Sequence, residues 1–394
     1  MCAKKKKTKS KKKHVQRLND SLPALDSLSG IPSFDKLVIT DAQISSYEDI
    51  CSRAISLGEV SSEELELGRV VRLDRGFPAI VSSTGLYRAE FATTLSKAKG
   101  TVAVGDWVCV RCPANHDMSL ILGVCTRKSE LSRWRGGARA ERQVLVANAD
   151  SVLITHPLGE REFVYDRIVR SVVVAYDCNM TAGIILTKAD LLTPSELIDN
   201  INTLKEVLEG IDIVVTCDKY SDIDDATKQS LIYATESCGC MWGVEAVKKL
   251  VPRSTSAILL GESGAGKSTL LNSILGKQAL ETGSVRSKDG AGRHTTVARR
   301  MVNIDDAGII IDAPGLRSLP VLGHERGLAK TFPQISVHAS ECKFRDCTHV
   351  HEPGCEVRLA LDNGEYSTTC LNSYLLLADE MRKAADNLDP DIVL

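Results

Sequence analysis

Long apolar runs are absent from this sequence of 394 residues. No stretch approaches the ~20 consecutive apolar residues that a membrane-spanning helix needs. No apolar segment follows the basic N-terminus, as one would in a secretory signal. We therefore expect a protein that neither enters a membrane nor is exported.

The sequence also lacks the even number of cysteines that is typical of a disulfide framework. The chain contains 13 cysteines, an odd number, and most stand singly in apolar surroundings, as Cys109, Cys125 and Cys178 do. Without a secretory signal, this pattern is typical of reduced thiols in a cytosolic protein rather than of a disulfide framework. We expect a cytoplasmic location.

Acidic residues are missing before Asp20, although the net charge of the whole chain is only −2. Most positions before His14 are lysines instead (Lys4–Lys7, Lys9 and Lys11–Lys13). Such a segment cannot bury apolar surface, so residues 1–64 are expected to form a basic, largely disordered extension. The lysines favour binding to nucleic-acid phosphates; a tail that only aids solubility is the alternative.

Residues 65–130 carry short runs of Val, Ile and aromatic residues between turn signals. The strands predicted there are Arg69–Leu73, Pro78–Ser82, Tyr87–Phe91, Asp106–Arg111 and Leu120–Val124. Five strands at this spacing favour a small Greek-key barrel of the OB type, for which we expect RNA binding.

A basic connector, Arg127–Arg142, follows the predicted barrel. It holds Trp134 between Arg133 and Arg135. This tryptophan either stacks on a nucleic-acid base or packs the barrel against the next domain, and both interpretations remain open.

Residues 139–322 alternate between apolar strands and helical segments. The predicted strands are Ser151–Thr155, Gly183–Thr187, Ile211–Thr216, Ala257–Leu260 and Ala307–Ile311, and the predicted helices are Glu162–Ala175, Pro194–Leu208 and Lys267–Leu275. This alternation predicts a parallel sheet covered on both faces. We expect a multidomain α/β protein with an N-terminal β-barrel.

A phosphate-binding loop stands between the predicted strand Ala257–Leu260 and the helix Lys267–Leu275. Its pattern G-x-x-x-x-G-K-[ST] comprises Gly261, Glu262, Ser263, Gly264, Ala265, Gly266, Lys267 and Ser268, and Thr269 continues the helix. A chance glycine-rich turn would lack the flanking strand and helix. Backbone N–H groups and the helix N-terminus are expected to hold the phosphates, and Lys267 to reach the β- and γ-phosphates.

Magnesium ligands are expected around this loop. Ser268 offers a hydroxyl, and Asp312 ends an apolar strand, as the usual Mg²⁺ partner does. Thr295 or Thr296, in a Gly- and charge-rich segment resembling a mobile switch, completes the Mg²⁺ shell; a plain surface turn is the alternative. Gly315, in the D-x-x-G run, is expected to sense the γ-phosphate.

Guanine selection is predicted from the T-K-x-D run Thr187, Lys188, Ala189 and Asp190, where the aspartate accepts hydrogen bonds from the guanine ring. This run precedes the P-loop, whereas ordinary GTPases place it afterwards, so the order indicates a circular permutation. The segment that closes over the base is either 216–218 or 235–237.

A cysteine and histidine cluster follows the α/β region. Cys342, Cys347, His349 and Cys355 offer three thiolates and one imidazole, which predicts a closed, structural zinc site in a C-terminal module of residues 323–394. His338 and His351 are spare imidazoles, and a disulfide is the alternative. A helix is expected at Tyr374–Asn387.

A water-orienting glutamine is missing after the switch glycine, where Leu316 stands instead. Intrinsic hydrolysis should therefore be slow. His294 is a candidate for positioning or deprotonating the attacking water; an exposed loop histidine without this role is the alternative.

The chain resembles the RsgA family (YjeQ, EngC) of ribosome-associated GTPases, from about Leu67 to Leu377. The motifs that carry the resemblance are Gly68-Arg-Val-Val, Asp74-Arg-Gly-Phe-Pro78, Val104-Gly-Asp-Trp-Val108, Thr187–Asp190, the P-loop, Gly292-Arg-His-Thr-Thr296, Asp312-Ala-Pro-Gly315 and the cysteine cluster. The family has Asn or Thr at the first position of the base-reading run, and Thr187 is the variant that lacks a side-chain amide. The resemblance also implies a role for His294.

The resemblance implies a GTP hydrolase that binds the small ribosomal subunit and its rRNA and assists late subunit assembly. Hydrolysis is then expected to be stimulated by the subunit. We expect the protein to be a monomer that holds one structural Zn²⁺ and binds GTP or GDP together with Mg²⁺. Two alternatives are an RNA-binding assembly chaperone that uses nucleotide only as a conformational ligand, and an ATPase with a coincidental T-K-x-D run.

Overall fold

The computed structural model describes residues 30–58, 60–74, 77–92, 102–112, 118–135, 141–159, 163–217, 223–276, 298–313 and 323–386, together with Leu25 and Leu28. The lysine-rich tail lies outside these residues, as do His294, Thr295, Thr296, Gly315 and Leu316. The side chains of Arg133, Trp134 and Arg135 are not described either, so both interpretations of Trp134 stay open.

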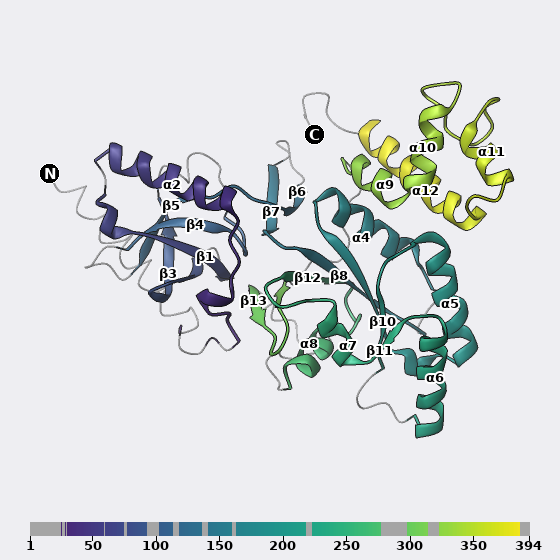
Figure 1. The fold of residues 1–394 in the computed structure, drawn as a ribbon, viewed down its shortest axis with the longest axis horizontal. Coiled ribbons are helices and arrows are strands. Elements are labelled where there is room, and N and C mark those ends of the chain that lie inside the picture. Colours follow the sequence, from purple (N-terminus) through teal and green to yellow (C-terminus); the bar gives the residue numbers. More distant parts are fainter. Residues whose placement is uncertain are drawn as a thin grey trace, which may run out of the picture.

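Five strands form a closed barrel near the N-terminus (Figure 1). The strands are β1 (Leu65–Asp74), β2 (Phe77–Ser82), β3 (Gly85–Phe91), β4 (Trp107–Arg111) and β5 (Ser119–Val124). Around the barrel their order is β1-β2-β3-β5-β4, and β4 pairs back to β1; β3 and β5 run parallel and the other pairs antiparallel. The predicted OB-type barrel and all five of its strands are confirmed.

The N-terminal extension contains ordered elements, so the prediction of a largely disordered segment over residues 1–64 is wrong for part of it. The elements are η2 (Phe34–Lys36), α2 (Asp41–Ser56) and η3 (Ser62–Glu64). Thr40 and Gln43 form a capping box at the start of α2, which satisfies N–H groups that the first helical turn leaves open.

Helix α2 packs across β4 and β5. Gly123 of β5 makes room for it, because a Cβ on this glycine would lie 2.8 Å from Cγ2 of Ile50. The side chain of Gln43 donates to Oδ1 of Asn148 at 2.9 Å in a buried contact. These contacts across the sequence order a segment whose composition alone indicates disorder.

The connector after the barrel folds as a β-hairpin of β6 (Glu130–Arg135) and β7 (Glu141–Ala147). Sequence analysis did not predict these strands, because charged residues interrupt their apolar pattern. The hairpin leads directly into the α/β region at Asn148.

Seven strands form the sheet of the α/β region, in the order β11-β10-β9-β8-β12-β14-β13. Their bounds are β8 (Ser151–Pro157), β9 (Thr181–Thr187), β10 (Ile213–Val215), β11 (Met241–Trp242), β12 (Ser256–Gly261), β13 (Arg299–Asn303) and β14 (Ile309–Asp312). All neighbours are parallel except β13, which is antiparallel to β14.

Helices cover both faces of this sheet. They are α4 (Asp166–Asp177), α5 (Pro194–Val207), α6 (Asp225–Ser237), α7 (Val244–Lys249) and α8 (Lys267–Leu275), with a short η4 (Ala189–Leu191). Alternate residues of β9 enter two separate buried clusters: Ile184 packs with residues of α4, α5 and α6, and Ile185 with residues of α7 and α8. The predicted two-faced parallel sheet is confirmed.

Four helices form the C-terminal module: α9 (Glu325–Thr331), α10 (Pro333–Glu341), α11 (Glu356–Asp362) and α12 (Thr368–Asp386). Figure 1 shows them at the end of the molecule opposite the N-terminal barrel. Helix α9 packs on α4, and α12 packs on α5 and α4. The helix expected at Tyr374–Asn387 corresponds to α12, which begins earlier. In the part of the chain that the structure describes, no helix has the length and apolar character to cross a membrane.

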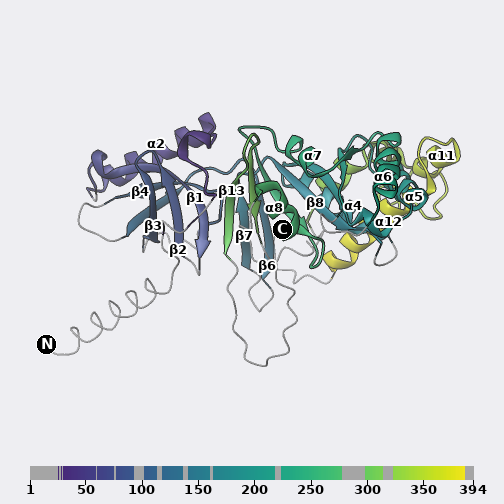
Figure 2. The same ribbon diagram turned by 90° about the horizontal axis from the view of Figure 1, so that it is seen from below.

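The barrel and the α/β sheet share one hydrogen-bonded ladder. Strand β1 pairs antiparallel with β13, with Arg72 opposite Arg300 and Leu73 opposite Arg299. Figure 2 shows the two strands side by side at the junction. The pairing joins the barrel and the α/β sheet into one continuous sheet of twelve strands.

Candidate active site and metal centre

The predicted P-loop connects β12 to α8, in the strand–loop–helix arrangement that phosphate binding needs. All three of its glycines have positive φ angles, +154° at Gly261, +85° at Gly264 and +78° at Gly266, which favour glycine because a side chain is strained there. A Cβ at Gly261 would lie 2.4 Å from the carbonyl oxygen of Thr155 on the neighbouring strand. The glycines therefore let the backbone turn tightly at the start of α8.

The side chain of Lys267 lies across the P-loop. Its Nζ donates to the carbonyl oxygens of Gly261 at 2.5 Å and of Glu262 at 2.6 Å. Ser263 and Ser268 are exposed beside it. An ammonium group held beside the backbone of the P-loop is suited to holding phosphate oxygens.

The carboxylate of Asp312 lies at the carboxyl end of β14, directly beside the P-loop strand, with Asp312 opposite Leu259. Its side chain is only 14% exposed. Burial raises the pKa of Asp312, while the charges of Arg300 and Lys267 act in the opposite direction. A buried carboxylate electrostatically coupled to the P-loop lysine fits a magnesium site, because Mg²⁺ prefers oxygen ligands and Ser268 offers another at the start of α8.

The T-K-x-D run begins where β9 ends, at the same edge of the sheet as the P-loop. The hydroxyl of Thr187 donates to the carbonyl oxygen of Ala265 at 3.0 Å, so the run and the P-loop are in direct contact. Lys188 has a left-handed conformation with φ +61°, and Asp190 is partly exposed at η4. The structure thus brings together two motifs that lie far apart in the sequence.

The two candidate segments for closing over the base differ in position. The carbonyl oxygen of Thr216 accepts the backbone N–H of Ala189 at 3.1 Å. Thr235 instead lies inside α6, fully buried, with its hydroxyl bonded to the carbonyl oxygen of Leu231. Thr216 therefore contacts the T-K-x-D run, and 235–237 form the end of a helix. Asp218 lies outside the described residues.

Sequence reasoning missed the charged partners of these motifs. Arg167 of α4 forms an ion pair with Glu262 of the P-loop, and Arg300 of β13 faces Asp312, with 4.0 Å between Nε and Oδ2. Three residues after Arg167, Arg170 pairs with Glu380 of α12. Neither arginine of the site belongs to a motif, so only the folded chain reveals them.

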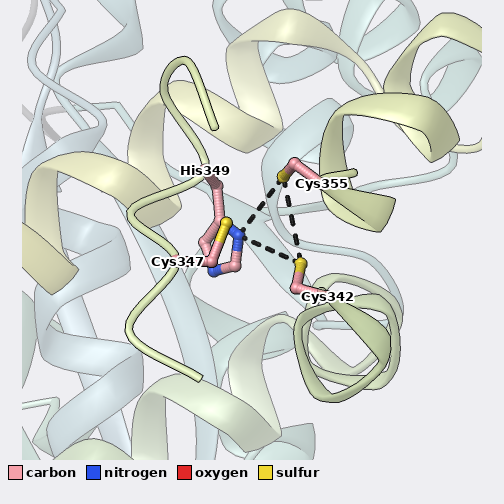
Figure 3. Close-up of side chains that lie close together, drawn as sticks. All are labelled: Cys342, Cys347, His349 and Cys355. Carbon is pink, nitrogen blue, oxygen red and sulfur yellow. Dashed lines mark hydrogen bonds between the residues drawn. The ribbon is translucent and has the colours of Figure 1, made fainter. Parts of the chain in front are cut away.

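The four predicted metal ligands converge in the C-terminal module (Figure 3). Their ligand atoms all lie within 4.8 Å of one another. The Sγ atoms of Cys342 and Cys355 are 3.9 Å apart, and they lie 3.6 Å and 3.5 Å from Nδ1 of His349. Ligands of a tetrahedral zinc ion are about 3.5–3.8 Å apart, so the four side chains fit such a metal closely.

The loop that carries His349 has its own supports. The carboxylate of Glu352 accepts the backbone N–H groups of Thr348, Val350 and His351. These bonds and that of the Thr348 hydroxyl hold the pKa of Glu352 well below its usual range. His349 has a positive φ of +63° and packs beside the ring of Tyr374.

The two other imidazoles considered as ligands, those of His338 and His351, do not belong to the metal-ligand cluster. Nε2 of His338 lies 3.0 Å from a carboxylate oxygen of Glu365, and His351 is exposed. Within the described residues, Cys342, Cys347, His349 and Cys355 are the only group of this kind that could hold a metal ion.

Comparisons with known proteins agree with this arrangement. The sequence model of the RsgA GTPase family matches residues 124–322. A small ribosomal subunit biogenesis GTPase RsgA from Streptomyces avermitilis is 33% identical over 333 residues, which cover 83% of each chain. A protein of the same name from Opitutus terrae is 36% identical over 298 residues, or 73% of this chain and 75% of that one.

Two solved structures share the fold. YjeQ from Thermotoga maritima matches with a TM-score of 0.58 and 23% identity, over 81% of this chain and 99% of its own. YloQ, described as a circularly permuted GTPase, matches with a TM-score of 0.55 and 21% identity, over 82% of this chain and 98% of its own. The predicted permuted order of elements is thereby confirmed.

Proposed function

Since this chain belongs to the RsgA GTPase family, we propose that it is a GTP hydrolase that binds the small ribosomal subunit and its rRNA and assists late subunit assembly. The GTPase activity follows from the family. The names of the relatives support the ribosomal role. The observation that carries the proposal is the hydrogen bond from Thr187 to Ala265, because it joins a guanine-type motif to a phosphate loop in one site.

The nucleotide contacts follow from the positions of the motifs. Asp190 would accept the ring N–H and exocyclic amine of guanine, while Thr187, Lys188 and Ala189 shape that loop against Thr216. Residues 261–269 would surround the phosphates, with Lys267 acting on the β- and γ-phosphates during hydrolysis. Gly315 would sense the γ-phosphate.

A magnesium ion beside the phosphates would be held by Ser268, Asp312 and one of Thr295 and Thr296. When bound, it neutralises charge on the transferred phosphoryl group. His294 would position the attacking water, since Leu316 replaces the usual glutamine. These assignments rest on sequence for the residues outside the described part of the chain.

The metal of the C-terminal cluster is assigned as one structural Zn²⁺. Three thiolates and an imidazole at tetrahedral distances favour zinc over the harder magnesium or calcium ions. Because all four positions are taken by protein ligands, the site supplies folding stability rather than chemistry.

The chain would consist of four regions with separate roles. The proposed boundaries are 1–64 for the basic extension, 65–130 for the RNA-binding barrel, 139–322 for the GTPase domain and 323–394 for the zinc module. The chain would act as a cytoplasmic monomer, with the barrel and the lysine-rich tail contacting rRNA.

GTP turnover with and without purified small ribosomal subunits tests this function. We expect many-fold stimulation by small subunits and none by large subunits. In single-turnover assays, His294→Ala should keep GTP binding and lose most hydrolysis. Unstimulated turnover would favour the alternative of an RNA-binding assembly chaperone for which nucleotide is only a conformational ligand. An unchanged single-turnover rate for His294→Ala would remove the histidine from the mechanism.

A further inference from the structure

A row of charged residues crosses the junction between the barrel and the nucleotide sheet. Arg72 of β1 lies opposite Arg300 of β13, and Arg300 lies opposite Asp312 of β14. Directly opposed residues of antiparallel strands project from the same face of a sheet. The three side chains therefore share one face, and the row ends at the proposed magnesium carboxylate.

The barrel end of the row is a buried carboxylate. Asp74 accepts Nε of Arg72 at 2.8 Å and Nη1 of Arg88 at 2.8 Å. The side chains of Asp74 and Arg88 are each 7% exposed. Charges so far removed from water are weakly screened, so a change at one end of the row acts on the other.

Charges at both ends of this row, Asp312 and Asp74, act on the guanidinium of Arg300. Burial lowers the pKa of its guanidinium, while Asp312 and Asp74 favour its charged form and Arg72 opposes it. Its 4.0 Å separation from Asp312 exceeds the 2.7–2.9 Å of a charge-assisted hydrogen bond. The pair is thus an electrostatic contact that a stronger cation can displace.

We propose that Arg300 is shared between Asp312 and Asp74, and that magnesium binding at Asp312 shifts it toward the barrel carboxylate. This inference rests on the proposed magnesium role of Asp312. A divalent ion beside Asp312 competes with Arg300 for the same negative charge and also repels the guanidinium. Because β13 is hydrogen-bonded to both β14 and β1, the shift reaches the barrel strand directly.

The test is the magnesium dependence of binding of a fluorescent GTP analogue. Without the competing charge, Arg300→Gln should bind the analogue at a magnesium midpoint several-fold lower than the wild type. Arg300→Lys, which keeps the charge, should stay near the wild type. The matched control is Arg299→Gln: this neighbour on β13 projects from the opposite face, and its midpoint should not change.

Hydrogen exchange supplies the second readout. Peptides covering β1 should change their exchange when the wild type passes from the magnesium-free to the Mg²⁺–nucleotide state, and this response should vanish in Arg300→Gln. An equal or higher magnesium midpoint in Arg300→Gln, or a retained β1 response, overturns the inference while leaving the GTPase assignment intact. A wild type without any magnesium dependence would overturn both the magnesium role of Asp312 and the inference.

Discussion

The hydroxyl of Thr187 donates a hydrogen bond to the carbonyl oxygen of Ala265 over 3.0 Å. Thr187 belongs to the T-K-x-D run proposed to read the base, and Ala265 belongs to the P-loop. Thr187 carries no side-chain amide, but its hydroxyl supplies a donor. The proposed base-reading run and the P-loop thus support each other through a direct hydrogen bond.

Removing this hydroxyl should weaken nucleotide binding. Thr187→Val keeps the shape of the side chain but removes this hydrogen bond, whose net worth is about 0.5–1.5 kcal/mol. We expect GTP affinity to fall by up to about tenfold in equilibrium titrations. Thr155→Val is the matched control, because the buried hydroxyl of Thr155 bonds to no partner among the described residues. Equal affinities for the two variants would contradict the coupling.

Replacing Asp190 should change base selection. Asp190→Asn replaces one of the two acceptor oxygens by an NH2 donor and removes the negative charge. One hydrogen bond to guanine is then lost and the other is no longer charge-assisted, where each charge-assisted bond is worth about 1.5–3 kcal/mol. GTP affinity should fall by at least about a hundredfold. Xanthosine triphosphate, with a carbonyl in place of the exocyclic amine, should bind the variant better than GTP does. Competition titrations measure this, and wild-type preference for GTP in the variant would exclude Asp190 from the base site.

Disrupting the cysteine and histidine cluster should release one metal and unfold the C-terminal module. Cys342→Ser or His349→Ala removes a ligand, and a module of this size depends on its metal. Elemental analysis should find one zinc per wild-type chain and much less in either variant. His338→Ala and Cys370→Ser alter neighbours outside the cluster and should retain the metal; zinc loss on replacing His338 would mean that the ligand set is wrong.

Acid should weaken the docking of α9 on α4 through Asp177. Burial raises the pKa of this carboxyl, but its hydrogen bond with His324, the charges of His324 and Arg326, and the N–H of Gly327 together hold it below the ordinary value. A depressed pKa contributes stability above the unfolded-state value of about 3.9, and this is lost as the pH falls through the folded value.

The free energy of unfolding of the wild type should therefore fall between about pH 5 and pH 3 more steeply than that of Asp177→Asn. Urea titrations at several pH values measure both slopes. Asp199→Asn, an exposed change on α5, serves as the control and should follow the wild type. Parallel curves for wild type and Asp177→Asn would show that Asp177 gives no pH-dependent stability.

Sequence patterns predicted those elements whose signal is local. The P-loop helix begins and ends as expected at Lys267 and Leu275, because glycines, strand and helix stand side by side in the chain. Helix α2 escaped prediction, since its order depends on Ile50 meeting Gly123 and on Gln43 reaching Asn148. The ion pairs of Arg167 and Arg300 likewise join residues from different elements, which no spacing rule reveals.

Local sequence patterns also could not identify the segment that closes over the base. In the sequence the first candidate follows a predicted strand and the second a polar stretch. The folded chain distinguishes them, because the backbone N–H of Ala189 donates to Thr216 while Thr235 lies inside α6. The metal cluster was predictable in full because its four ligands lie within one short stretch, where chain geometry leaves few ways to arrange them.

The permuted order has a consequence for how the C-terminal module is attached. Strand β14 is the last strand of the sheet along the chain, and only a short segment separates Asp312 from α9. In an unpermuted GTPase the chain would return to the sheet from this point. Here the chain continues into the module instead, and Asp177 and Arg170 of α4 bind the module's helices. The helices of the metal-binding module are therefore fixed to the nucleotide sheet through α4, and the chain enters the module directly after the strand that carries the proposed magnesium carboxylate.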